Sequence, residues 1–356
     1  MVLIPTFMVS IGSYEVKAIK SITVSLTDGS TPSAAQVIIP TTKSTDLERF
    51  TDNTEVNISL GFCGEEAELG KVFKGWITKI SETLPLEITA EDGIMLTKKL
   101  AENKTYCTDD DPIYYSDIAK DLIVQTGLNP VIPEDGPGIK QHSVTFDEDQ
   151  SILERLDRLK QKTQWIYHCI PGTNEIYFGP AWPYDRGHLP EKNDLLVFRI
   201  GNRKANWPDS RGNVISVSNL DSKNRNPYSR VTCLLQDRVQ TATSIQKRAR
   251  APNGNQTENL KIEHCFSENN SLNERYAERC AQEMVYELNS TRTSGTFFTF
   301  GNPNLYPWHP IQLEWHKDLP ASSLSGRYNV KNVTYTYDLE SGFRMSVDFR
   351  TPPGRQ

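Results

Sequence analysis

The chain has few cysteines and no long apolar run, and each shortage excludes a class of protein. The 356 residues contain six cysteines without a C-x-x-C pair: Cys63, Cys107, Cys169, Cys233, Cys265 and Cys280. This spacing fits neither the disulfide framework of a short secreted protein nor a structural zinc site. No stretch approaches the ~18 uninterrupted apolar residues that a membrane helix requires. We therefore expect free thiols and no membrane-spanning helix.

An excess of positive charge is also absent, because 39 Lys and Arg residues stand against 45 Asp and Glu residues, a net charge of −6. A protein that neutralises phosphates needs a concentrated excess of basic side chains, which excludes a globally basic nucleic-acid binder. Residues 1–10 have no basic region and alternate like a strand. We expect no signal peptide, and a soluble chain made in the cytosol.

The common catalytic signatures are missing as well. Residues 136–138 (Gly-Pro-Gly) are too short for a phosphate-binding loop, and neither a G-x-S-x-G nor an H-E-x-x-H segment is present. Two adjacent pairs, His168-Cys169 and His264-Cys265, would point to opposite faces of a strand and so cannot share a metal ion. We expect no catalytic residue, no cofactor-binding residue and no metal ligand.

Two acidic clusters need their own interpretation, because glycosidases use two carboxylates across a cleft. Asp147, Glu148 and Asp149 directly precede an expected helix, where carboxylates accept hydrogen bonds from the first backbone N–H groups. Residues 109–111 are an Asp-Asp-Asp run in a loop before Pro112. We expect capping and solvated loops, with catalysis or binding of a divalent cation as the alternatives.

A basic run and an aromatic group each allow two interpretations. Residues 246–250 (Gln-Lys-Arg-Ala-Arg) form either a solvated loop between strands or a contact for an acidic surface or nucleic acid. Residues 306–310 (Tyr-Pro-Trp-His-Pro) form either a rigid turn packed on the rim of a barrel or a platform that stacks on sugars. The structural interpretation is favoured for both.

Apolar periodicity predicts a mainly β (α+β) fold in three parts. Residues 1–103 form a first antiparallel β-barrel of short strands, with a long hairpin over residues 72–90. Residues 104–194 form an α+β module of two helices and a hairpin. Its first helix is capped by Ser116 and runs through Thr126, and its second carries apolar residues from Ile152.

Residues 195–356 form a second β-barrel around an inserted helix. Ser271 and Glu274 make a capping box, and apolar residues at helical spacing continue to residue 289, so the helix is expected over residues 271–289. Strands are expected at residues 296–300, 311–315, 327–337 and 343–349.

The long hairpins that begin near Phe73 and Tyr328 share several features. Each follows a Gly-containing loop, turns through polar residues and returns to a carboxylate, Asp92 in the first and Asp348 in the second. An internal duplication of one β-fold would explain these features. Any two long hairpins share some of them, so both explanations stay open.

This order of parts resembles the baseplate hub proteins of contractile phage tails, including the late control D family and the hub portion of type VI secretion spike proteins. Residues 73–77 (Phe-Lys-Gly-Trp-Ile) through 88–93 are similar to the family's F-x-G-x-I hairpin. Residues 151–156 resemble its helix, and residues 301–330 resemble its ending. His309-Pro310 departs from the pattern, because family members often carry glycine there.

The resemblance implies a structural protein and not an enzyme. It implies a homotrimer whose chains each supply two tube-like barrels, so that three chains form a pseudo-sixfold ring joining the sixfold tail tube to a trimeric spike. Other baseplate proteins would be partners, no small molecule would be a substrate, and DNA or an effector would pass through the channel.

The resemblance also implies a location, the baseplate of a phage tail or injection device assembled in the bacterial cytoplasm. Two alternatives stay open. One is a tail-tip protein of a non-contractile phage tail, and the other is a tail-associated peptidoglycan hydrolase.

Overall fold

The computed structural model describes residues 4–40, 50–63, 69–81, 84–106, 113–133, 140–141, 144–189, 195–201, 213–222, 230–236, 244–250, 259–263 and 293–352. The described part is mainly β-structure with two α-helices, as the apolar periodicity predicted. No helix in these ranges is both long and apolar enough to cross a membrane.

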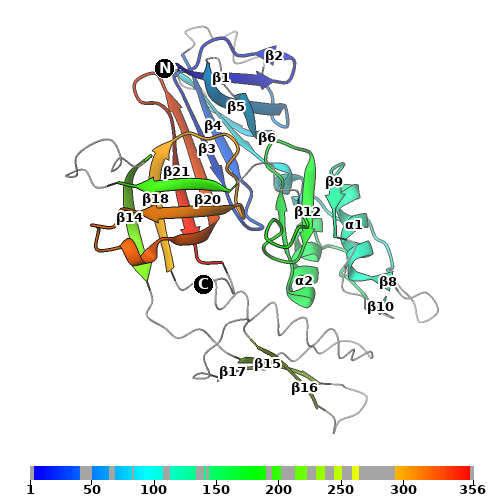
Figure 1. The fold of residues 1–356 in the computed structure, drawn as a ribbon. Helices are drawn as coiled ribbons and strands as arrows, with labels where there is room; N and C mark the ends of the chain where they lie inside the picture. Colours follow the sequence, from blue (N-terminus) through cyan, green and yellow to red (C-terminus); the bar gives the residue numbers. More distant parts are fainter. Residues whose placement is uncertain are drawn as a thin grey trace.

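Strands from both ends of the chain join in one sheet of 13 strands (Figure 1). The N-terminal strands are β1 (Ile4–Ile11), β2 (Tyr14–Glu15), β3 (Ser21–Leu26), β4 (Ala34–Ile39), β5 (Glu55–Cys63), β6 (Leu69–Ile80) and β7 (Leu86–Glu91). The later strands are β13 (Leu196–Ile200), β14 (Val214–Ser222), β18 (Thr293–Phe300), β19 (Pro310–Trp315), β20 (Gly326–Asp338) and β21 (Gly342–Arg350). The order across the sheet is β14-β18-β21-β20-β3-β4-β7-β6-β5-β1-β2, and β19 pairs with both β13 and β20.

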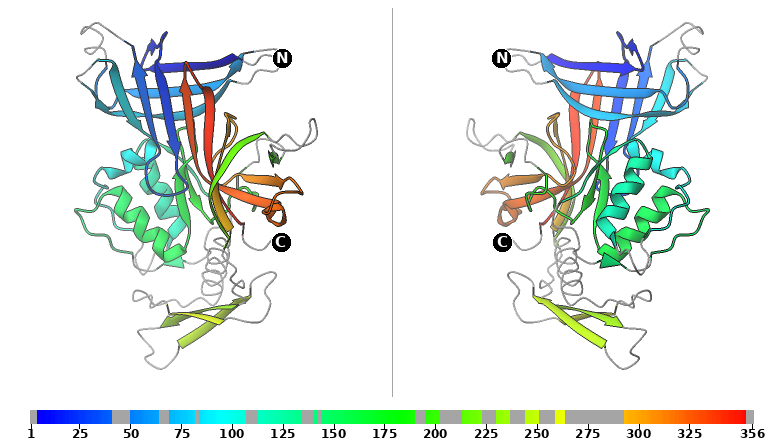
Figure 2. Two further views of the ribbon diagram at one scale, coloured as in Figure 1. Left: turned by 90° about the vertical axis from the view of Figure 1, so that its left-hand side faces the viewer. Right: turned by 90° about the vertical axis from the view of Figure 1, so that its right-hand side faces the viewer.

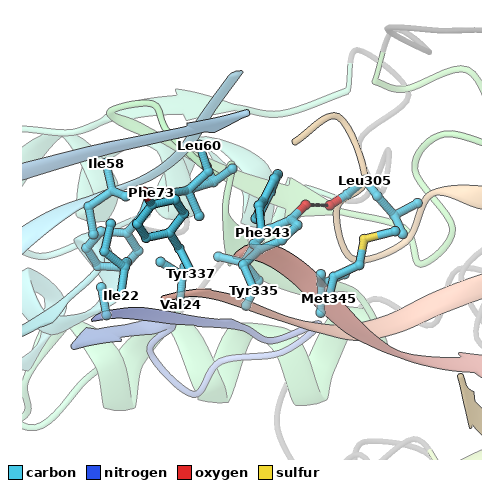
Figure 3. Close-up of a cluster of buried hydrophobic side chains, with 14 of the residues drawn as sticks. Ile22, Val24, Ile58, Leu60, Phe73, Leu305, Tyr335, Tyr337, Phe343 and Met345 are labelled. Carbon is cyan, nitrogen blue, oxygen red and sulfur yellow. Dashed lines mark hydrogen bonds between the residues drawn. The ribbon is translucent and has the colours of Figure 1, made fainter. Parts of the chain in front are cut away.

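The alternation of the strands places one hydrophobic core beneath both halves of this sheet. Ile22, Val24 and Leu26 of β3 are buried while the residues between them are half-buried, and β21 repeats the pattern. Side chains from the two ends of the chain share this core, and Figure 3 shows Phe73 and Tyr337 among them. Each such side chain contributes about 1.5–3 kcal/mol through burial, so the two halves stabilise one another.

The module between the halves contains two helices and a small sheet. The helices α1 (Tyr115–Gln125) and α2 (Ile152–Thr163) pack with β11 (Ile166–Cys169) and β12 (Glu175–Gly179) around a core of their own. The expected hairpin is confirmed by the antiparallel pairing of β11 with β12. The third strand, β9 (Asn129–Val131), pairs with β12 in parallel and was not predicted.

Helix capping in the module corrects two expectations. The first helix begins at Tyr115, so Ser116 lies inside it and is not its cap. The second is capped by Ser151, whose hydroxyl accepts from the Glu154 N–H while the Glu154 carboxylate accepts from the Ser151 N–H. This capping box satisfies the first N–H groups that were assigned to the acidic residues 147–149.

Five further strands and two 3₁₀ helices complete the described elements. They are β8 (Ile113–Tyr114), β10 (Lys140–Gln141), β15 (Arg230–Gln236), β16 (Ser244–Arg250), β17 (Asn259–Glu263), η2 (Gly93–Lys98) and η3 (Ser322–Leu324). The run 246–250 was expected in a loop but lies in β16, which pairs with β15. The helix expected over residues 271–289 lies outside the described residues.

Candidate assembly surface

The large sheet contains the same strand order twice. In the N-terminal half, the order is β3-β4-β7-β6-β5-β1, and in the C-terminal half it is β14-β18-β21-β20-β19-β13. The first five strands of each series pair antiparallel. The last pair differs, because β1 is antiparallel to β5 whereas β13 is parallel to β19.

The two halves also share a turn with a left-handed residue. Asn53 (φ 64°) and Trp308 (φ 71°) each lie two residues before β5 or β19. The Asn53 N–H donates to the Ile77 carbonyl at 2.9 Å, and the Trp308 N–H donates to the Val330 carbonyl at 2.8 Å. A positive φ is uncommon outside glycine, so its recurrence with the same backbone bond indicates a repeated unit.

A second repeated contact ties β4 to the end of β7 and β18 to the end of β21. In the first half, the Ser33 N–H donates to Asp92 Oδ2 at 3.0 Å and the Asp92 N–H donates to the Ser33 carbonyl at 2.9 Å. In the second half, the Thr293 N–H donates to Thr351 Oγ1 at 3.0 Å and the Thr351 N–H to the Thr293 carbonyl at 2.9 Å. The Asp92 carboxylate in the first half and the Thr351 hydroxyl in the second therefore accept equivalent backbone hydrogen bonds.

The bulges fix which residues are equivalent. The register of β6 shifts between Ile77 and Lys79, and that of β20 shifts between Val330 and Asn332. Lys79 then faces Thr89, while Asn332 faces Asp348. The carboxylates that were compared in the sequence are thus not equivalent, because Asp348 corresponds to Thr89 and Asp92 to Thr351.

The halves meet where β20 pairs with β3. Residues from Val333 to Asp338 of β20 pair antiparallel with residues from Leu26 back to Ser21 of β3. The eight strands β14-β18-β21-β20-β3-β4-β7-β6 are therefore two four-strand units joined edge to edge, and we call them the paired units. Figure 2 shows the red β20–β21 hairpin lying alongside the blue N-terminal strands.

The face of the paired units opposite the core is polar. Ser21, Thr23 and Ser25 alternate there on β3, and Gln36 Nε2 donates to Glu87 Oε1 at 2.7 Å. Asp348 accepts hydrogen bonds from Thr296 Oγ1 at 2.7 Å and from Asn332 Nδ2 at 3.1 Å. This face carries several hydroxyl groups, and two of its carboxylates, Glu87 and Asp348, accept hydrogen bonds from neighbouring strands.

A half-buried cation joins the three parts of the chain. The Arg350 guanidinium lies 4.7 Å from the Trp182 ring centroid and 4.5 Å from that of Trp308, and its NH2 lies 2.9 Å from Asp28 Oδ2. Burial raises the pKa of Asp28, and the charge of Arg350 opposes that shift. The Trp308 indole N–H also donates to the Asp28 carbonyl at 3.0 Å, so these contacts link the two halves.

Buried titratable groups outside this cluster have structural roles. Burial raises the pKa of Asp92 to about 6, although the N–H groups of Ser33 and Ile94 donate to its oxygens. Burial lowers the pKa of His168 to about 3, which keeps its ring neutral beside Tyr177 and Trp308. These two groups are buried for packing and capping.

The structure also places the residues singled out in the sequence. Asp147 Oδ2 accepts from Gln150 Nε2 at 2.9 Å, and Glu148 Oε1 accepts from Asn103 Nδ2 at 2.9 Å, so both serve loop contacts. The acidic run 109–111 and the glycine run 136–138 lie outside the described residues.

The aromatic group 306–310 is a packed turn, as favoured. Tyr306, Trp308 and His309 are buried. The left-handed backbone conformation is at Trp308, one residue before the His309-Pro310 pair that replaces the glycine often found in the resembled family. Its buried rings make it unsuitable as an exposed sugar platform.

The adjacent pair in β11 behaves as the strand geometry predicted. Cys169 packs in the core of the module, near Gly93, whereas His168 points to the opposite side against Trp308. Cys63 and Cys169 are free thiols. Cys107, Cys265, Cys280 and His264 lie outside the described residues. Among the residues that the structure describes, no three His, Cys, Asp or Glu side chains gather as a metal site would need.

Comparison with known proteins finds similarity in structure and not in sequence. No protein-family model matches the chain. No curated protein sequence matches it either.

Solved structures match over nearly the whole chain. The tail protein from Neisseria meningitidis MC58 matches with a TM-score of 0.66 at 13% identity, covering 97% of this chain and 96% of that one. The 43 kDa tail protein of prophage MuSo2 from Shewanella oneidensis matches with a TM-score of 0.67 at 10% identity, covering 98% of both chains. A chain of the Francisella PdpA-VgrG complex matches with a TM-score of 0.56 at 10% identity, covering 100% of this chain and 60% of that one.

The chain thus has the fold of these tail proteins. The resemblance read from the order of its motifs is confirmed at the level of the fold, and the mainly β (α+β) class is confirmed with it.

Proposed function

We propose that the chain is a structural hub of a phage tail or contractile injection device, and that three copies form a ring with six similar units. The observation that carries this proposal is the repeated four-strand unit, joined within the chain at β20 and β3. A chain with two copies of one unit makes a threefold assembly that presents six units around its axis. The three-part division at residues 1–103, 104–194 and 195–356 belongs to the same proposal.

Such a ring connects partners of different symmetry. Its six units would contact the sixfold tail tube, and the single module of each chain would mark the threefold symmetry that suits a trimeric spike. The hydroxyl-rich face of the paired units would line the channel, where DNA or an effector passes without a concentrated basic surface to hold it. The place of action would be the baseplate, after assembly in the bacterial cytoplasm.

This role needs shaped polar interfaces and no reactive group. The carboxylates of Asp147 and Glu148 are engaged by loop side chains, which agrees with a non-enzymatic protein. The proposal therefore includes no catalytic residue, no cofactor and no small-molecule substrate. The fold does not distinguish a contractile baseplate from the tip of a non-contractile tail, and a neighbouring sheath gene would favour contraction.

The mass of the assembled protein tests the proposal. We expect sedimentation of the purified chain, alone and mixed with the trimeric spike protein of the same tail or device, to give a species of three copies. A chain that stays monomeric at assembly concentrations both with and without the spike would refute it.

A further inference from the structure

The connection between β14 and β18 differs greatly in length from its equivalent in the first half. These strands correspond to β3 and β4, which residues 27–33 join, whereas residues 223–292 join β14 to β18. Within the longer connection, β15, β16 and β17 form a sheet of their own in the order β16-β15-β17, which Figure 1 shows apart from the 13-stranded sheet. An insertion in one of two repeated units is not needed to form the unit, and such connections often carry binding residues.

The register of this inserted sheet places basic residues together on one face. Residues that pair across strands share a face, and so do residues two apart in one strand. Arg230 of β15 pairs with Arg250 of β16. Two residues further along β15, Thr232 pairs with Arg248 on one side and with Lys261 of β17 on the other. Four basic residues therefore lie within two rows of one face, and we call Arg230, Arg248, Arg250 and Lys261 the basic face.

The opposite face of the same sheet is mainly apolar in sequence. It holds Val231, Cys233, Leu235, Ile245, Ala249, Leu260 and Ile262, with Lys247 as the one charged residue among these positions. Amphipathic sheets pack through the apolar face, so a role in recognition falls to the other face. Because residues 246–250 lie in a strand and not in a loop, the second interpretation from the sequence applies, a contact for an acidic surface or nucleic acid.

Two features favour an acidic protein over a nucleic acid as the partner. No aromatic residue occurs in β15, β16 or β17, so the sheet lacks the rings on which single-stranded bases stack. The basic face is also small, about 10 Å across three strands and ~7 Å along them, whereas a duplex carries its charge continuously along its axis. In the next row along β15, Leu234 pairs with Glu263, so the positive charge does not continue in that direction.

We propose that the basic face binds a carboxylate-rich segment of a partner protein. An arginine guanidinium carries paired N–H donors that match the two oxygens of a carboxylate, and three of the four basic residues are arginines. The whole chain has a net charge of −6, so four basic residues in two rows are a local exception that selects a partner region of opposite charge. The inference does not depend on the proposed ring, because it concerns one chain and one partner segment.

Binding of an acidic peptide by the full chain tests this proposal. The probes are a fluorescein-labelled oligoglutamate peptide and a labelled short DNA duplex, each titrated with the protein at physiological salt and followed by fluorescence anisotropy. The variant Arg230→Gln, Arg248→Gln, Arg250→Gln removes three charges from the basic face. We expect its affinity for the peptide to fall by at least ~tenfold, because three charge-assisted contacts are lost together. Added salt should weaken peptide binding by the wild type.

Two control variants separate the local charge from the net charge and from the fold. The variant Lys17→Gln, Lys20→Gln, Lys79→Gln changes the net charge by the same amount at exposed lysines elsewhere in the chain. Its affinity for the peptide should change by less than ~twofold, because charges beyond about 8–10 Å are screened at this salt. Replacing the three arginines of the basic face with lysine keeps the charge, and that variant should bind the peptide within ~threefold of the wild type.

Three results would overturn the proposal. The first is no binding of the peptide by the wild type, and the second is equal binding by the wild type and the glutamine variant. The third is tighter binding of the duplex than of the peptide, lost in the glutamine variant, which would assign the basic face to nucleic acid. Each of these results leaves the proposed hub intact, because the mass of the assembled protein tests the hub separately.

Discussion

The buried carboxylate of Asp92 gives the sharpest test of the repeated contact between β4 and β7. In the native protein its oxygens accept 3.0 Å hydrogen bonds from the N–H groups of Ser33 and Ile94. The equivalent position in the second half, Thr351, accepts one such bond through a hydroxyl that does not titrate near neutral pH. The two halves therefore make the same contact with different dependence on pH.

Burial raises the native pKa of Asp92 from 3.8 to about 6. A group with a raised native pKa binds more protons when folded, so its stabilisation is complete below its unfolded pKa and is lost as pH rises through the folded one. With 1.36 kcal/mol for each pKa unit, the loss between pH 3 and pH 7 is roughly 3 kcal/mol. The variant Asp92→Asn removes the titration and should lack this slope.

The assay is urea unfolding of the wild type and of Asp92→Asn at several pH values from 3 to 7. We expect the free energy of unfolding of the variant, relative to the wild type, to rise by roughly 3 kcal/mol over that range. Thr351→Val is the matched control, because it removes the equivalent hydrogen bond at a cost of about 1 kcal/mol that is independent of pH. A difference between Asp92→Asn and wild type that does not change with pH would refute the reasoning.

Three further variants test other contacts. Arg350→Met should destabilise the protein by about 2 kcal/mol because it leaves the half-buried Asp28 carboxyl without its cation, and adding Asp28→Asn should restore part of the loss in the same urea assay. Ser151→Ala should cost about 1 kcal/mol by removing the helix cap, as measured by thermal unfolding. Replacing residues 147–149 with Asn-Gln-Asn should leave cell-wall turnover by assembled particles unchanged, whereas its abolition would favour the hydrolase alternative.

The sequence predicted most strands and several hairpins, but not which distant strands pair. Alternating apolar residues predicted short strands within residues 1–103, and Ile22, Val24 and Leu26 of β3 show that alternation, because one face of a strand repeats every two residues. The same alternation holds for β20, and nothing in either pattern says that these two distant strands are neighbours. Period and turn residues are local signals, whereas the junction between the halves depends on packing across the whole core.

The sequence indicated a possible duplication but matched the wrong residues between its two copies. The sequence comparison aligned Asp92 with Asp348 because both are carboxylates at the end of a hairpin. The structure aligns Asp92 with Thr351, since a hydroxyl and a carboxylate can accept the same backbone N–H. The amino-acid types do not show that Asp92 and Thr351 are equivalent. The positions of the bulges and of the left-handed residues Asn53 and Trp308 show it.

Contacts made by distant single residues were missed for a similar reason. Arg350 lies at the end of β21, and its partners Asp28, Trp182 and Trp308 come from three other segments. The capping box of Ser151 was also overlooked in favour of the neighbouring acids, although the Ser-x-x-Glu spacing was a usable signal.

An image of the assembled particle along its axis tests the central claim most directly. Three copies, alone or bound to the spike, should give a ring whose inner wall shows six similar units and whose outer part shows three modules. An assembly with any other number of units, or a particle of one copy that does not close into a ring with its spike, would contradict the account.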